Sequence, residues 1–198
     1  NFFEIFKINI LLKKWVPDIG FNPWPNGFES CYLLSYCKKY KFYKNFFKPK
    51  VINHYQVVRK YLNLKEKKWD IEELSLKKCY KKILICPQST DIDRSISNQQ
   101  LDAITYKAKF DFKALTITIA SLSSEYFRSD YISFGFKKNA KTSQTFIQLL
   151  KNSDLIICAD SAPLHLANAL NKDVIAVFNF TKPEIVINSG DKLSIFKD

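Results

Sequence analysis

The chain has 198 residues, 46% of them hydrophobic; this is enough to bury a core in one full domain and part of another, and it excludes wholesale disorder. The formal net charge of +12 raises the question of an anionic partner, either nucleic acid or a membrane surface. Nearly all the cations are Lys, because Arg occurs only at Arg59, Arg94 and Arg128. Since base readout and bidentate phosphate contacts favour Arg, we expect no nucleic-acid partner and interpret the charge as a solvated surface that can meet anionic lipid head groups.

Five cysteines lie at positions 31, 37, 79, 86 and 158, with no C-x-x-C pair and no His cluster beside them. Neither a zinc site nor a disulfide framework is therefore predicted. No apolar run approaches the roughly eighteen residues that a membrane span requires. We expect a cytoplasmic protein that is peripheral at the inner face of the cell membrane.

Residues 1 to about 64 carry an irregular, aromatic pattern. Pro23, Pro25 and Gly27 predict a loop over 19–27. Over 31–48, aromatic residues alternate with Lys, which favours an amphipathic helix over a surface that stacks single-stranded nucleic acid. A helix is predicted over 54–64, and the charged stretch 64–82 is interpreted as a linker between domains.

Residues 80–198 alternate short apolar runs with helical patterns. Strands are predicted at 83–86, 115–119, 131–136, 155–158 and 174–178. Helices are predicted after the capping box that begins at Ser97, from Glu125, after Thr142 or Ser143, and over 164–170. Such alternation predicts an α/β domain with a doubly wound parallel sheet, in which ligands bind at the carboxyl ends of the strands. The glycine-rich motifs of dinucleotide dehydrogenases and P-loop enzymes are absent from the sequence.

The turn after the strand at 155–158 carries the strongest functional signal. Asp160 and Ser161 are followed by Ala162 and Pro163, a pattern typical of a helix start. A helix that begins here directs its free N–H groups and the positive end of its dipole at one place, which favours an anion. His165 can add a donor and Asp160 can accept hydrogen bonds from sugar hydroxyls. The alternative is that Asp160 or Ser161 caps the helix and His165 packs on the surface.

This segment also carries a family resemblance. The run from Asp160 to Ala167, with the strand 174–178 and with Thr181-Lys182-Pro183, resembles the signature D-[ST]-G-x-x-H-[LI]-A of the lipopolysaccharide heptosyltransferases, glycosyltransferase family 9. Residue types and spacing agree along this segment. Ala162 stands in place of the usual Gly, and Asn179-Phe180 in place of the usual Gly-Pro. The resemblance covers residues 83–184 well, 50–64 weakly and little else.

The resemblance implies a donor site made by the loops at the strand ends. Ser89 and Thr90 match the hydroxyl residues of its first donor loop, with Arg94 at the place of a phosphate-binding Lys. Glu125 resembles an acidic residue that contacts the nucleotide ribose, although Ser121-Leu122-Ser123-Ser124 replaces the family's glycines there. Lys141 or Thr142 is expected to line the adenine pocket. With Asp160, Ser161, Ala162 and His165, these residues form the predicted substrate-binding set. Arg94 as a solvated loop cation and Glu125 as a dipole-favoured residue of a first helical turn are the alternatives.

The fold implied by the resemblance is the C-terminal donor-binding half of a GT-B-type glycosyltransferase. We expect residues 1–79 to be a partial N-terminal, acceptor-side region with a linker, and residues 80–198 to be the Rossmann-like donor domain. The implied reaction transfers heptose from an ADP-heptose-like nucleotide sugar to the lipopolysaccharide inner core, with inversion and with neither metal nor cofactor. The family's general base is an Asp beside a Gly-rich turn in the N-terminal domain; no such stretch occurs here, so no catalytic residue is assigned. The alternatives are a catalytically incomplete remnant that only binds nucleotide and a basic nucleic-acid-binding module.

Overall fold

The computed structural model describes residues 18–22, 37–42, 53–61, 64–65, 72–135, 140–188 and 191–197. The chain divides into two compact units, Asn1–Glu66 and Lys67–Asp198, and each is described by itself. In the described segments, no helix combines the length and the apolar character that crossing a membrane requires.

The described part of the first unit contains two short strands and one helix. Strand β1 (Ile19–Asn22) pairs in parallel with β2 (Lys39–Phe42). Helix α3 (His54–Tyr61) begins after Asn53, whose Oδ1 accepts hydrogen bonds from the backbone N–H groups of Tyr55 and Gln56 at 2.9 and 3.2 Å. The helix expected within 54–64 is confirmed.

Two predictions in this unit are wrong where the structure describes them. The expected loop over 19–27 contains β1, which ends at Asn22, immediately before the proline that would remove a ladder hydrogen bond. The expected helix over 31–48 contains β2 instead. Lys39 to Phe42 alternates Lys with an aromatic ring at every second residue, which is the period of a strand and not of a helix. The rest of both segments lies outside the described residues.

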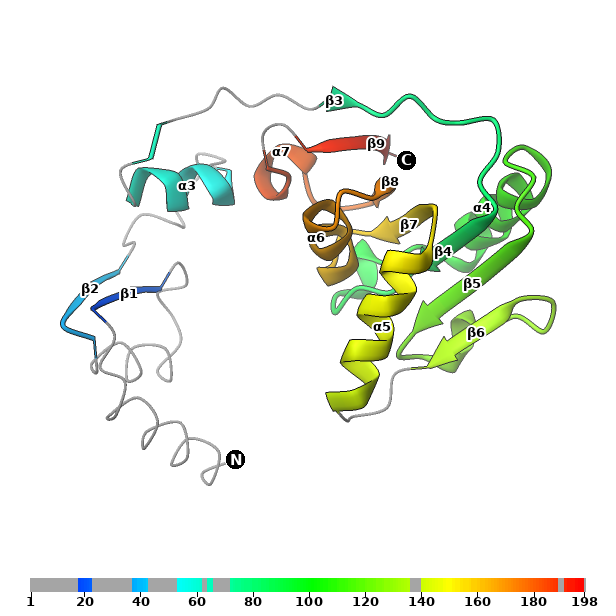
Figure 1. The fold of residues 1–198 in the computed structure, drawn as a ribbon, viewed down its shortest axis with the longest axis horizontal. Helices are drawn as coiled ribbons and strands as arrows, with labels where there is room; N and C mark the ends of the chain where they lie inside the picture. Colours follow the sequence, from blue (N-terminus) through cyan, green and yellow to red (C-terminus); the bar gives the residue numbers. More distant parts are fainter. Residues whose placement is uncertain are drawn as a thin grey trace. The chain divides into compact units, whose positions relative to one another are not determined.

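The second unit is built on a seven-stranded, all-parallel sheet with the order β3-β9-β8-β7-β4-β5-β6 (Figure 1). Its strands are β3 (Glu72–Glu73), β4 (Lys82–Cys86), β5 (Thr116–Ser121), β6 (Ile132–Gly135), β7 (Leu155–Ala159), β8 (Asp173–Phe178) and β9 (Lys192–Lys197). After the edge strand β3, the chain enters the centre of the sheet with β4, runs outward to β6, returns beside β4 as β7, and then runs outward in the other direction to β9, beside β3. This order confirms the predicted α/β, doubly wound parallel sheet.

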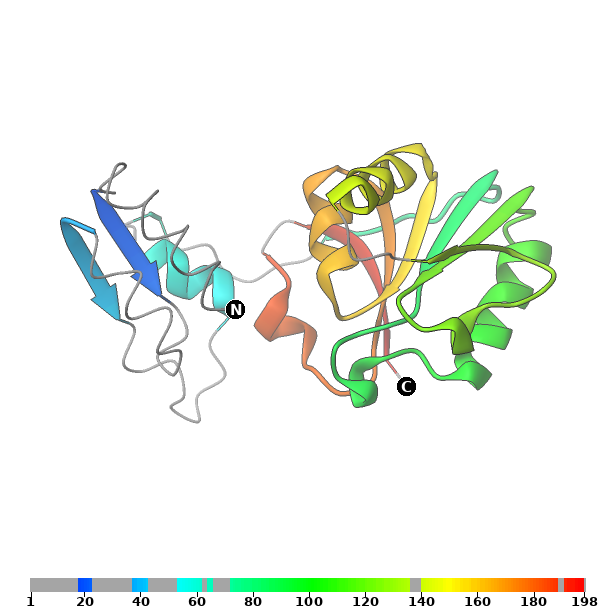
Figure 2. The same cartoon turned by 90° about the horizontal axis from the view of Figure 1, so that it is seen from below.

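Helices cover both faces of this sheet. Helix α4 (Asn98–Phe110) lies on one face, whereas α5 (Ala140–Asn152) and α6 (Ala162–Ala169) lie on the other (Figures 1 and 2). Alternate residues of each central strand face opposite cores, as the pleat requires: Leu84 and Ile156 pack with α5 and α6, while Ile85 and Ile157 pack toward α4. A short helix, α7 (Pro183–Val186), precedes β9.

The helix starts predicted from local sequence patterns were correct at one position and wrong at two. The capping box is confirmed: Gln100 N–H donates to Ser97 Oγ at 3.2 Å, and Ser97 N–H donates to Gln100 Oε1 at 2.9 Å. The predicted helix from Glu125 is wrong, because the structure has a single 3-10 turn, η2 (Ser124–Tyr126). The predicted start at Thr142 or Ser143 is also wrong, because α5 begins at Ala140.

The predicted linker over 64–82 also contributes to the sheet. Strand β3 pairs in parallel with β9, and Leu74 and Tyr80 are buried. From Lys67 onward this segment belongs to the second compact unit. The proposed functional division, into an acceptor-side region over 1–79 and a donor domain over 80–198, stays a prediction.

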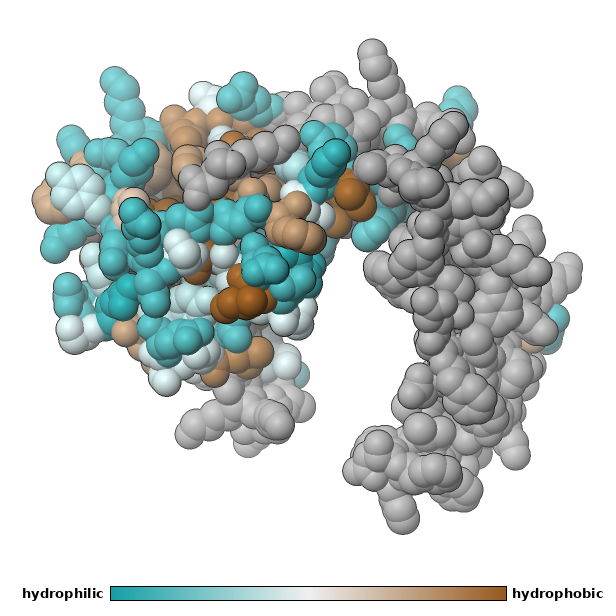
Figure 3. Space-filling view, turned by 180° about the vertical axis from the view of Figure 1, so that it is seen from behind, coloured by the Kyte–Doolittle hydropathy of each residue, from teal (hydrophilic) through white to brown (hydrophobic). Residues whose placement is uncertain are grey.

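The face that carries α4 is only partly covered. A groove of about 500 Å³ lies beside α4, over β7, β8 and β9. Its apolar lining includes Ile175 and Val177 of β8 and the half-exposed Phe196 of β9. Figure 3 shows apolar side chains among the polar ones on this side of the second unit.

Candidate functional site

The candidate site lies where the strand order reverses. β4 and β7 are neighbours in register, from Ile83 beside Leu155 to Cys86 beside Cys158. Two successive crossovers leave this point in opposite directions, so the loops at the carboxyl ends of β4 and β7 separate above the sheet and leave a crevice where ligands bind in doubly wound folds. The residues predicted from these two loops, at 89–94 and 160–162, are therefore brought together.

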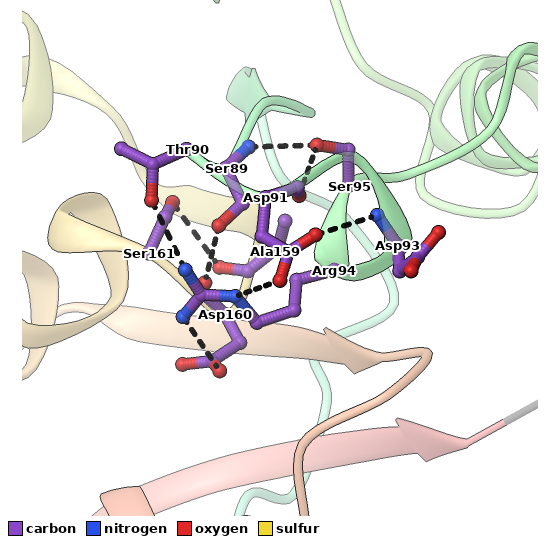
Figure 4. Close-up of polar contacts among 9 residues, drawn as sticks. All are labelled: Ser89, Thr90, Asp91, Asp93, Arg94, Ser95, Ala159, Asp160 and Ser161. Carbon is purple, nitrogen blue, oxygen red and sulfur yellow. Dashed lines mark hydrogen bonds and ion pairs between the residues drawn. The ribbon is translucent and has the colours of Figure 1, made fainter.

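Ser89 joins the two loops. Its Oγ donates to the backbone carbonyl of Asp160 at 3.1 Å, and its N–H donates to Ser95 Oγ at 2.9 Å (Figure 4). Ser95 Oγ in turn donates to the carbonyl of Asp91 at 3.2 Å. Both Ser89 and Ser95 are buried. The hydroxyl of Ser89 thus fixes the shape of the site, and its predicted contact with a substrate requires another of its lone pairs or a rearrangement.

Arg94 provides the positive charge of the site. It ends the short turn η1 (Ile92–Arg94), and its Nη2 donates to Thr90 Oγ1 at 3.0 Å. Its Nη1 lies 3.6 Å from Asp160 Oδ2, and its Nε lies 3.9 Å from Asp91 Oδ2 (Figure 4). A guanidinium has five N–H donors, so these contacts leave donors for a further acceptor.

Among the predicted residues whose side chains the structure describes, Asp160 is the most buried charged one, with 3% of its surface exposed. Its Oδ2 is buried without a hydrogen bond and has the Arg94 guanidinium as its ion-pair partner. Removing a carboxylate from water is unfavourable unless charge and hydrogen bonds compensate it. In the structure this compensation comes from the charge of Arg94, and the predicted contact of Asp160 with a substrate stays a prediction.

Helix α6 begins at the same point. Ser161 is its N-cap residue, but its side chain makes no capping bond; its Oγ donates to the Ala159 carbonyl at 3.5 Å. Pro163 has no N–H, and the Leu164 N–H donates to the Ser161 carbonyl at 3.0 Å. The exposed Ala162 thus carries the remaining N–H of the opening turn that can point at a ligand.

The other predicted residues lie at the edges of this arrangement. His165 is half-buried on α6, four residues after Ser161. Glu125 is exposed in η2, where its N–H donates to Ser123 Oγ at 3.4 Å. Lys141 lies in the first turn of α5, and its side chain is outside the described part of the structure. Their substrate contacts stay predictions.

Two side-chain amides that the sequence did not single out hold the loops together. Gln88 Oε1 accepts three hydrogen bonds from the loop that follows β5. Asn179, which stands where the resembled family has Gly, donates through Nδ2 to the Ser95 carbonyl at 2.7 Å and forms a reciprocal amide pair with Gln100 at 3.0 Å in both directions. Only the departure from Gly at 179 could have drawn attention to it.

Two thiols lie directly below the site. Cys86 and Cys158 are buried on neighbouring strands, and burial raises the pKa of each thiol well above its ordinary value; Asp160 adds to the effect at Cys158. Both thiols are therefore protonated at neutral pH and behave as small apolar groups. In the described ranges, no group of three or more His, Cys, Asp and Glu side chains could hold a metal ion.

Comparison with known proteins shows a partial family match and a shared fold. Residues 140–197 match the model of glycosyltransferase family 9 (heptosyltransferase). Among solved structures, the chain is similar to a glycosyl transferase family 9 protein from Veillonella parvula DSM 2008, with a TM-score of 0.63, 12% identity, and coverage of 96% of this chain and 66% of that one. It is also similar to the ADP-heptose lps heptosyltransferase II of E. coli, with a TM-score of 0.55, 10% identity, and coverage of 96% and 75%.

Other matches are partial. The chain covers 34% of the dodecameric glycosyltransferase TibC from enterotoxigenic E. coli H10407 (60% of this chain, 16% identity, TM-score 0.46), so it spans about a third of that protein's length. No curated protein matches the sequence. At these identities the solved structures show the fold alone, and this confirms the expected α/β, GT-B-type fold. Over residues 140–197 the chain is thus similar in sequence to glycosyltransferase family 9 (heptosyltransferase).

Proposed function

We propose that this chain binds the donor in a glycosyltransferase that transfers heptose from an ADP-heptose-like nucleotide sugar to the inner core of lipopolysaccharide, with inversion and without a metal. The observation that carries the proposal is the meeting of Arg94, the buried Asp160 and the start of α6 at the carboxyl ends of β4 and β7. The family match over 140–197 and the likeness to a solved ADP-heptose heptosyltransferase support the donor class.

The residues of the site suit the departure of a nucleoside diphosphate. Cleavage of the bond between the sugar and the diphosphate places growing negative charge on the phosphate oxygens. The Arg94 guanidinium, whose side chain is 29% exposed, can donate to those oxygens while it keeps its contact with Thr90. The N–H of Ala162 and the dipole of α6 add to this stabilisation, and His165 can supply a further donor.

ADP binding tests this proposal. In calorimetry with the full chain, we expect ADP to bind and Arg94→Ala to weaken binding about tenfold or more, because a charge-assisted phosphate contact is lost. Arg128→Ala is the matched control: this arginine is 30% exposed and also pairs with an aspartate, but it lies on the α4 side of β6 and not in the site. The proposal fails if ADP does not bind, or if the two variants weaken it equally.

A chain that binds nucleotide without turnover is the second candidate. In the described part of the first unit the single carboxylate is Asp18, and its Oδ1 is paired with Lys38 Nζ at 2.7 Å, so it is a poor general base. An assay of heptose transfer to lipopolysaccharide core separates the two: ADP binding without transfer favours the binding chain, whereas transfer establishes the enzyme.

The net charge of +12 supports contact with an anionic acceptor at the inner face of the cell membrane. Co-sedimentation with anionic vesicles should then fall as salt rises, and neutral vesicles should leave the chain in solution. Equally tight, salt-dependent binding to DNA would favour the basic nucleic-acid-binding module instead.

A further inference from the structure

The side chain of Gln88 gathers the loop that follows β5. Gln88 comes directly after the β4 strand and its Pro87, and its Oε1 accepts hydrogen bonds from Ser121 Oγ at 2.7 Å, Leu122 N–H at 2.8 Å and Ser123 N–H at 3.1 Å. The three donors converge on one oxygen. Because an amide oxygen has two lone pairs, this acceptor is fully used.

The hydrogen bonds to Gln88 are long-range contacts that hold the loop after β5 against the end of β4. The donors are separated from Gln88 by 33 to 35 positions in the chain, and they bridge two adjacent parallel strands, β4 and β5, at their carboxyl ends. Ser123 N–H also points at Ser121 Oγ at 3.1 Å, so the loop folds around the Gln88 oxygen. Without that oxygen, the Leu122 N–H would need water as its acceptor, the Ser123 N–H would keep only Ser121 Oγ, and the loop would lose its anchor to β4.

The same loop sets the place of Glu125. Ser123 Oγ accepts the Glu125 N–H and so starts η2, while on the other side Gln88 is followed by Ser89, which is bonded to the Asp160 carbonyl. The adjacent residues Ser89 and Gln88 thus connect two sets of hydrogen bonds, one to Asp160 and one to the turn that carries Glu125. They link the charged end of the site with its exposed edge.

We propose that Gln88 is a positioning residue for the nucleoside half of the donor: it fixes the loop after β5, and with it Glu125, relative to the phosphate-binding residues. This inference rests on the proposed function. In this proposal, Arg94 and the start of α6 contact the phosphates, and their positions do not depend on the Gln88 side chain. The loop after β5 contacts the nucleoside, and its position does depend on Gln88.

Two ligands separate these contributions in calorimetry with the full chain. Pyrophosphate reaches only the phosphate-binding residues, whereas ADP also reaches the loop after β5. We expect Gln88→Ala to weaken ADP binding about tenfold, the effect of about one net hydrogen bond, and to change pyrophosphate binding less than about twofold. Ser121→Ala, which removes one of the three donors, should also weaken ADP binding more than pyrophosphate binding, but by less than Gln88→Ala does. Gln99→Ala, an exposed glutamine at the start of α4, is the matched control and should change neither.

Hydrogen exchange reports on the loop independently of ligand. Gln88→Ala should lose protection at the Leu122 and Ser123 N–H groups while the central strands stay protected, and Gln88→Glu, which keeps an acceptor oxygen, should restore it. Equal losses of ADP and pyrophosphate affinity in Gln88→Ala, or unchanged exchange at these two groups, would overturn the inference. A wild-type chain that binds neither ligand would instead overturn the proposed function, and the nucleotide role of Gln88 with it.

Discussion

Replacement of Arg94 by Ala tests the electrostatic basis of the site through stability. The Asp160 side chain is 4% exposed, its Oδ2 has no hydrogen bond, and Arg94 Nη1 is 3.6 Å away. Arg94→Ala removes this compensating charge and leaves a carboxylate that water reaches poorly. Asp160→Asn removes the charge itself, and the remaining arginine can turn toward water.

The expected size follows from exposure and distance. Removing one partner of a fully buried ion pair costs about 3–5 kcal/mol, whereas exposed pairs contribute about 0–1 kcal/mol. Here the carboxylate is buried, but the Arg94 side chain is 29% exposed and the contact is longer than a hydrogen bond. We therefore expect Arg94→Ala to lower the free energy of unfolding by about 2 kcal/mol and Asp160→Asn by less than about 1 kcal/mol. The double variant Arg94→Ala/Asp160→Asn should regain at least about 1 kcal/mol relative to Arg94→Ala, since the buried charge is gone.

Urea unfolding at pH 7, followed by far-UV circular dichroism, measures these differences. With a slope of about 2 kcal/mol/M, a loss of about 2 kcal/mol moves the midpoint down by about 1 M. Arg128→Ala is the control, because its partner Asp102 is 70% exposed and can be solvated when the arginine is removed. The reasoning is refuted if Arg94→Ala costs no more than Arg128→Ala, or if Asp160→Asn adds to the loss instead of reversing it.

Three further predictions concern the scaffold. Burial raises the pKa of Cys86 and Cys158, so the unfolded chain releases these two protons near pH 9 while the folded chain keeps them. The stabilising contribution of the two protonated thiols is fully present at pH 7, and the free energy of unfolding should fall above about pH 9, by up to about 2.7 kcal/mol per pH unit. Urea unfolding at several pH values under reducing conditions measures this slope. A Cys86→Ala/Cys158→Ala variant with the same slope would contradict the prediction. Ser97→Ala should cost about 1 kcal/mol through loss of the capping box, measured by thermal unfolding, whereas Ser97→Asp should retain most of the stability. Leu164→Ala should lower the free energy of unfolding by about 2–5 kcal/mol because Leu164 is fully buried, whereas Leu166→Ala, at a residue of the same helix that is 37% exposed, should lower it by less than about 1 kcal/mol. Similar urea midpoints for the two variants would contradict the packing of the Leu164 face of α6 against the core.

The sequence by itself determined the centre of the second unit. The runs at 83–86, 155–158 and 174–178 are continuous and apolar because both faces of a central parallel strand are buried, and each forms a strand in the structure. The capping box at Ser97 and the break after α6 are equally local: Asn171 adopts a φ of 52°, which Asn tolerates better than most residues. The pattern from Asp160 to Pro183 also led to the family whose model matches residues 140–197.

Only the tertiary structure decided the edges of the sheet and the connections within the site. β3 lies in a charged stretch and β9 went unpredicted, since an edge strand gains its structure by pairing with a neighbour more than from its own composition. The contact of Ser89 with Asp160 spans 71 positions, and that of Gln88 with Ser121 spans 33. Both depend on β4 lying between β7 and β5, and the strand order is a property of how the whole sheet packs. Short-range preferences therefore identified the groups that could bind a donor, whereas the packing of the sheet decided which of them meet.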